Sequence, residues 1–110
     1  MTKVNADEII EFIKNNLTDK ELYQKIVKRY YYHPVYVNIQ FKIQTGKNIS
    51  QYITETKMEM IHKLISEGKS CHEAIIAVSV SDIAWAGRRY KELFGERMLD
   101  TKMRATEEGV

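Results

Sequence analysis

The side chains best suited to chemistry in this chain are amides and cations, and they suit hydrogen bonding to bases and phosphates. Asn38 carries an amide that offers a donor and an acceptor together, as contact with a base edge requires. Arg88 carries a guanidinium whose fork matches the O6 and N7 acceptors of guanine, whereas the ammonium of Lys42 suits a phosphate. We therefore ask which elements of the chain hold these residues.

Positive charge is concentrated in two stretches, although the net charge of the 110 residues is only +2. Seven Lys or Arg stand against two acids from Lys20 to Lys57, and six stand against three from Arg88 to Arg104. The segments outside these stretches are acidic. Charge blocks of this kind usually form solvated helix faces, so charge alone does not establish that the chain binds nucleic acid.

Composition favours an all-α protein without catalytic groups. The chain has one proline, five glycines and almost no alternation of polar and apolar residues. Cys71 is the single cysteine, and no apolar run is long enough for a signal peptide or a membrane span, which indicates a cytoplasmic protein. We expect no enzyme activity, no cofactor and no metal, because catalytic sets and phosphate loops are missing and His33, His62 and His72 lack zinc-ligand spacing.

The longest periodic segment is Asn48–Ser66, whose apolar residues recur at the three-, four- and seven-residue steps of an amphipathic helix. These apolar residues are Ile49, Ile53, Met60, Ile61, Leu64 and Ile65. Asn48 is placed to cap this helix, and Gly68 to end it. We expect the isoleucines up to Ile61 to pack on the segment before the helix, and the residues from Leu64 on the segment after it.

Three shorter helices are expected before the central one, each begun by a capping residue or a proline. They run from Asn5 to about Asn16, from a capping box at Thr18–Glu21 to about Tyr30, and from Pro34 to about Ile43. The third should bury Val37 and Phe41, and the second and third together form a helix-turn-helix. Tyr30, Tyr31 and Tyr32 are expected to pack at a helix end, with phosphate contact as the alternative.

The same plan follows the central helix. A capping box at Ser70–Glu73 opens a helix that buries Ala74, Ile75 and Val78, and a second helix runs from about Asp82 to Phe94 with Trp85, Ala86, Tyr90 and Leu93 largely apolar. Trp85 is either a core anchor or an apolar base contact. Phe41–Gly46 and Tyr90–Gly95 both read aromatic-Lys-x-x-x-Gly, 49 residues apart, which predicts two related helix-turn-helix units.

In these segments the chain resembles the DNA-binding domain of AraC/XylS-type bacterial transcription regulators, and within it the MarA/SoxS-like activators. The resemblance spans roughly Asp7 to Arg104. Its clearest motifs are His33-Pro34-x-Tyr36-Val37-x-x-x-Phe41-Lys42-x-x-Thr45-Gly46, Gln51-Tyr52-Ile53-x-x-x-Lys57-Met58 and Arg88-x-Tyr90-Lys91-x-x-x-Gly95. It implies an all-α fold of seven helices with two helix-turn-helix subdomains, at 1–47 and 68–104, joined by a linker helix at 48–67 and followed by a flexible tail at 105–110.

The resemblance also implies a monomer that places two recognition helices in successive major-groove segments of double-stranded DNA. We expect the DNA contacts to come from Val35, Tyr36, Asn38, Ile39 and Lys42 in the first unit and from Ile83, Ala84, Gly87, Arg88 and Lys91 in the second. The chain departs from the family pattern at Ile39, Ser79, Val80, Ala86 and Met98.

Two alternatives stay open. One is a protein-interaction module with this fold that acts on another regulator or on RNA polymerase and binds DNA only weakly. The other concerns the chain itself, which is either a stand-alone regulator controlled by its abundance or a domain of a longer regulator.

Overall fold

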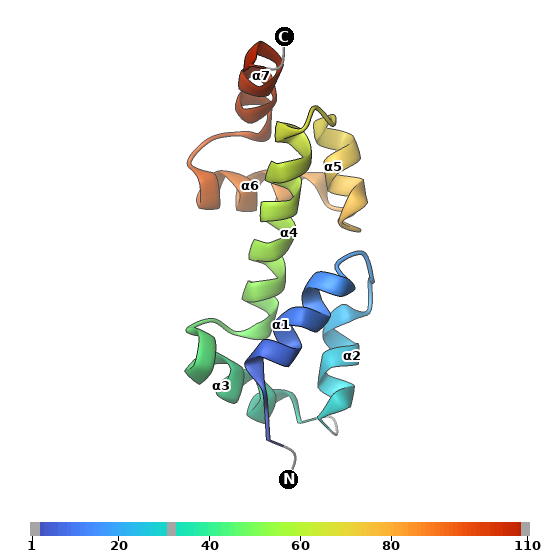
Figure 1. The fold of residues 1–110 in the computed structure, drawn as a ribbon, viewed down its shortest axis with the longest axis vertical. Helices are drawn as coiled ribbons and strands as arrows, with labels where there is room; N and C mark the ends of the chain where they lie inside the picture. The colour runs from blue at the N-terminus through green and yellow to red at the C-terminus, as the bar shows by residue number, and fades with distance from the viewer. Residues whose placement is uncertain (1–2, 31–32, 109–110) are drawn as a thin grey trace. The chain divides into compact units, whose positions relative to one another are not determined.

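The computed structural model describes residues 3–30 and 33–108, and every regular element in them is an α-helix (Figure 1). The helices are α1 (Ala6–Asn15), α2 (Leu22–Arg29), α3 (Pro34–Thr45), α4 (Ile49–Ser66), α5 (Cys71–Ala77), α6 (Ile83–Phe94) and α7 (Met98–Glu108). The described residues therefore confirm the predicted all-α class with seven helices.

The chain divides into two compact units, Met1–Ile53 and Thr54–Val110. The boundary falls within α4, which is a single continuous helix, so the structure does not set residues 48–67 apart as a linker. The first turn of α4 completes the first unit, and the rest of the helix belongs to the second. Fully buried Ile61 thus belongs to the second unit, and the expectation that it grips the first unit was wrong.

Side-chain caps start four of the helices, and three of these caps, at Asn5, Asn48 and Ser70, were predicted. Asn5, Asn48, Ser70 and Asp82 each accept the backbone N–H three residues later, at 3.2, 2.8, 3.1 and 2.9 Å. The predicted capping box at Thr18 was wrong, because α2 begins only at Leu22. Asp19 instead closes a local turn, with its Oδ1 accepting the Glu21 N–H at 2.8 Å.

The core of the first unit joins α1 to α3. Ile9 and Ile13 of α1 are buried, as are Val37 and Phe41 of α3. A side-chain amide fastens the two helices, because Gln44 Oε1 accepts the Ala6 N–H and Gln44 Nε2 donates to the Val4 carbonyl, both at 3.0 Å. Sequence periodicity gave no sign of this clamp.

Tyr30 lies at the end of α2 and is buried, which confirms a packing role for it. Tyr31 and Tyr32 lie outside the described residues.

The second unit is built on α5, α6 and α7 together with most of α4. Ala74, Ile75 and Val78 are buried as predicted, and so are Ala86 and Tyr90 of α6. Two details differ from expectation. Leu93 is 43% exposed, so it does not belong to the core face of α6. Met58 of α4 is fully buried although the predicted apolar stripe omitted it, whereas Met60 is only half-buried.

The turn between α5 and α6 contains the one non-glycine residue with a positive φ among those described, Ser79, at +57°. L-residues reach this left-handed region at a cost, which glycine avoids. Ser79 therefore adopts the backbone conformation that glycine favours in such a turn. The Val80 N–H donates to the Ile75 carbonyl at 3.3 Å.

The C-terminal segment is more ordered than expected, because α7 continues to Glu108 where a tail was predicted from residue 105. Between Met98 and Glu108 there is no glycine or proline to end the helix. Buried Met98 and Thr101 anchor its first turn. Residues 109–110 lie outside the described part of the chain.

Candidate nucleic-acid interface

The repeated aromatic-Lys-x-x-x-Gly pattern ends α3 and α6 in the same way. Phe41 and Tyr90 are fully buried, and the lysine that follows each aromatic residue is exposed. Gly46 and Gly95 adopt left-handed φ values of 83° and 72°, and their N–H groups donate to the carbonyl of that lysine at 2.7 and 2.8 Å. Each unit thus fixes its candidate recognition helix by one buried ring and one glycine cap.

On α3, the structure places four of the five predicted contact residues at the surface. Val35 and Ile39 are 72% and 52% exposed, Lys42 is exposed, and Tyr36 is half-buried. The Lys42 ammonium forms no hydrogen bond or ion pair with any residue that the structure describes. This face therefore offers aliphatic groups and one cation.

The fifth residue, Asn38, has its amide engaged within the first unit. Its Oδ1 accepts the Ile49 N–H at 3.0 Å, and its Nδ2 lies 2.9 Å from both the Tyr23 hydroxyl and the Pro34 carbonyl. Both ends of the amide are therefore engaged inside the first unit, where they hold the start of α4 against α3. We propose that Asn38 supports the start of α4, and its predicted contact with a base stays a prediction.

Replacing this amide tests the reassignment. We expect Asn38→Ala to lower the free energy of unfolding by about 1–3 kcal/mol, because the Ile49 N–H and the Tyr23 hydroxyl lose their partner. Chemical denaturation of the purified variant measures this loss. Asn15→Ala is the matched control, since the Asn15 amide is exposed and contacts only Glu11 at 3.4 Å. Unchanged stability of Asn38→Ala together with weaker DNA binding would restore the base-reading role.

On α6, all five predicted contact residues line an open groove of about 680 Å³. They are Ile83, Ala84, Gly87, Arg88 and Lys91. The groove is also lined by Cys71 and Ile75 of α5, by Arg97, and by Met98 and Leu99 in the first turn of α7. The structure therefore brings together the second-unit residues that the sequence predicted, and it adds a partly apolar wall that the sequence did not predict.

Most cations of the second basic stretch are already paired within the unit. Arg89 pairs with Glu92 at 2.8 Å, and Arg97 with Asp100 at 3.0 Å. A third pair joins Arg104 to Glu96 at 2.5 Å, and Lys102 donates to the Gly68 carbonyl at 2.7 Å. Arg88 and Lys91 are the two cations of this stretch that form no ion pair or side-chain hydrogen bond with any described residue. Both line the groove.

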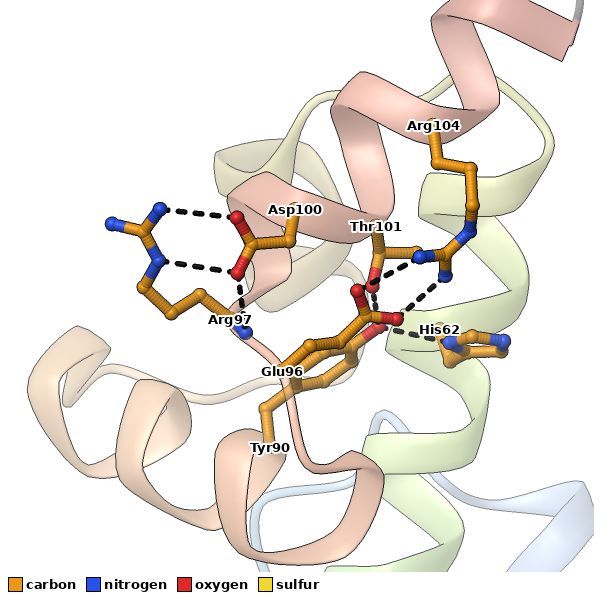
Figure 2. A network of polar contacts seen from close by, with 7 residues as sticks. All are labelled: His62, Tyr90, Glu96, Arg97, Asp100, Thr101 and Arg104. Carbon is orange, nitrogen blue, oxygen red and sulfur yellow. Dashed lines mark hydrogen bonds and ion pairs between the residues drawn. The ribbon is translucent and has the colours of Figure 1, made fainter.

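The orientation of α6 is set by a polar contact network around Tyr90, shown in Figure 2. The Tyr90 hydroxyl lies 2.8 Å from His62 Nδ1 on α4 and 2.7 Å from Thr101 Oγ1 on α7. His62 also stacks on Phe94 with ring centroids 4.6 Å apart. Burial raises the pKa of the Tyr90 hydroxyl, so this group stays protonated and able to donate.

Two ion pairs hold the start of α7 next to this network (Figure 2). The hydrogen bonds from Arg104 lower the pKa of the Glu96 carboxyl. Those from the side chain and the backbone N–H of Arg97 lower the pKa of Asp100 in the same way. All four side chains are largely or partly exposed, so their main effect is to fix local geometry. Arg97, which lines the groove, is held in place by its pair with Asp100.

Other kinds of site receive no support from the described residues. Within them, no three side chains of His, Cys, Asp or Glu come together in a way that could hold a metal ion. None of the helices in the described part of the chain is both long and apolar enough to cross a membrane.

Comparison with known proteins yields two similarities, and no family model matches the sequence. The chain is 31% identical over 58 residues to the HTH-type transcriptional regulator YobQ of Bacillus subtilis (strain 168). The match covers 53% of this chain and 24% of YobQ, so it spans about a quarter of that protein. The structure superimposes with a TM-score of 0.81 on a probable AraC family transcriptional regulator from Rhodopseudomonas palustris CGA009, with 19% identity over 91% of this chain and 95% of that one. Two helix-turn-helix units with matching helix ends are thus found in a chain that has the fold of an AraC family transcriptional regulator.

Proposed function

We propose that the chain is a sequence-specific DNA-binding transcription regulator that inserts α3 and α6 into adjacent major-groove segments of double-stranded DNA. One observation carries the proposal. The helix that follows the turn in each unit ends on the same combination of buried ring, exposed lysine and left-handed glycine, and it keeps an outward face that the rest of its unit does not cover. A duplicated, rigidly held and exposed second helix is what a two-site reader of DNA requires.

The two faces are suited to different contacts. In the second unit, Arg88 is placed to bridge guanine O6 and N7, and Lys91 to meet a phosphate, with Ile83, Ala84 and Gly87 along the same face. In the first unit, Lys42 meets a phosphate and the aliphatic residues approach base edges. The protein would bind as a monomer, because each chain already carries two such units.

Salt dependence tests the phosphate contact of Lys42. We expect Lys42→Ala to weaken binding to every duplex and to lower the slope of log affinity against log salt by about one, because one phosphate contact is lost. Titration of labelled duplexes at several salt concentrations measures the slope. Lys14→Ala removes an equally exposed charge from α1 and should leave the slope unchanged. Duplex affinity that does not vary with salt in the wild-type protein would refute DNA binding altogether.

A second function is favoured by exposed aliphatic residues. Ile43, Leu99 and Met103 are 73%, 51% and 56% exposed, and such side chains suit a protein partner such as another regulator or RNA polymerase. The salt experiment separates the two functions, because a protein-interaction module would show neither a steep slope nor a response to Lys42→Ala.

A further inference from the structure

Three exposed aliphatic side chains form a stripe along α3. Val35, Ile39 and Ile43 are 72%, 52% and 73% exposed. They are spaced four residues apart, so each step moves about 6 Å along the helix axis and about 40° around it. Valine and isoleucine are usually buried, and single exposed ones need no explanation, but three in succession on one helix indicate a contact surface.

The internal repeat shows which residues of α6 correspond to the stripe on α3. A shift of 49 residues places Ile39 in the register of Arg88 and Val35 in the register of Ala84. The second unit therefore presents a guanidinium at the position where the first presents a branched hydrocarbon. The nearby amide of Asn38 is engaged with Ile49 and Tyr23, so the centre of the α3 face has no free polar group with which to read a base.

We infer that α3 selects thymine, through contact of Val35 and Ile39 with the C5-methyl groups that thymine presents in the major groove; this inference rests on the proposed function. The thymine methyl is the one apolar group that a base edge offers there. Successive base pairs rise by about 3.4 Å, so side chains about 6 Å apart meet methyl groups roughly two base pairs apart. Ile43, turned about 80° from Val35, lies toward the sugar-phosphate edge.

DNA explains the stripe better than a protein partner does. A stable protein interface needs about 800 Å² on each side and some twenty to thirty residues, which three side chains on one helix do not supply. The stripe is also flanked by exposed Lys42, whose ammonium has no ion-pair partner among the described residues. Aliphatic groups beside an unpaired cation match a methyl-bearing base next to a phosphate.

The test removes methyl groups from the DNA. A duplex selected by the 110-residue chain from a random pool is resynthesised with each thymine in turn replaced by uracil, which lacks only the C5-methyl. We expect one or two replacements in one half of the site to lower affinity about fourfold each, as loss of a buried methyl predicts. Ile39→Ala should cause a similar loss and should abolish the effect of one of these replacements, because both changes remove the same contact.

Ile76→Ala is the matched control, because Ile76 is 57% exposed and belongs to α5 of the second unit, whereas α3 belongs to the first. It should leave both affinity and every uracil effect unchanged. Affinity that is insensitive to uracil throughout the site would overturn the thymine inference, while the response to Lys42→Ala would still support the proposed function. An Ile39→Ala loss that is additive with every uracil replacement would overturn it too. Failure to select any salt-sensitive duplex would overturn both proposals.

Discussion

Insertion of one alanine between Glu55 and Thr56 is expected to lower affinity for a two-part site about 100-fold. The helix α4 continues without a break from the first unit into the second, so one added residue turns everything after it by about 100° relative to everything before it. If both units must bind at once, the linkage contributes on the order of 100-fold to affinity, and the insertion removes that contribution. Titration of the selected duplex measures the loss.

The insertion should leave each unit folded, because it falls just past the boundary at Ile53 and before Met58, the first fully buried residue of α4 in the second unit. Circular dichroism and thermal unfolding check this point. Insertion of one alanine after Glu107, near the end of α7, is the matched control and should leave affinity unchanged. Unimpaired binding by the α4 variant would show that α4 does not set the phase between two reading units.

Arg88→Ala is expected to cost about 1–3 kcal/mol of binding free energy on a selected site and much less on a scrambled duplex. Arg88 is the outward guanidinium on α6 that is not committed to an ion pair within the described residues, so its fork is available for guanine. Arg88→Lys keeps the positive charge and should retain the salt slope while losing part of the preference for the selected site.

Fluorescence anisotropy with selected and scrambled duplexes separates these effects. Lys14→Ala again serves as the charge control, because Lys14 is exposed on α1. An equal loss of affinity on both duplexes would indicate that Arg88 contacts a phosphate and not a base. No loss on either duplex would mean that the groove face of α6 does not meet DNA.

Local signals in the sequence were enough to place most of the helices. The caps at Asn5, Asn48, Ser70 and Asp82 and the left-handed stops at Gly46 and Gly95 depend on residues within one turn of each other, so they could be identified without any tertiary information. The start of α2 was missed because Asp19 closes a local turn on the Glu21 N–H, which competes with an earlier helix start.

The candidate site was only partly predictable. That Arg88 and Lys91 face outward on α6 followed from helical periodicity, since the buried Ala86 and Tyr90 define the opposite face. Whether the neighbouring cations are paired depended on contacts between residues that are distant in the chain. Arg104 is tied to Glu96, eight residues away, and is thereby removed from the free cations of a basic stretch. Charge counting along the chain cannot distinguish such a paired arginine from Arg88.

The sequence by itself determined the all-α class, the two related units and most of the helix ends, because caps, glycine stops and helical periodicity are encoded by residues close together in the chain. Only the tertiary structure decided which polar groups remain available. The amides of Asn38 and Gln44 and the hydroxyl of Tyr90 are engaged by partners 11 to 40 residues away, so no local pattern reveals them. In the folded protein, α3 therefore has an aliphatic face and α6 a cationic one. The aromatic-Lys-x-x-x-Gly motif is the same in both helices and does not predict this difference.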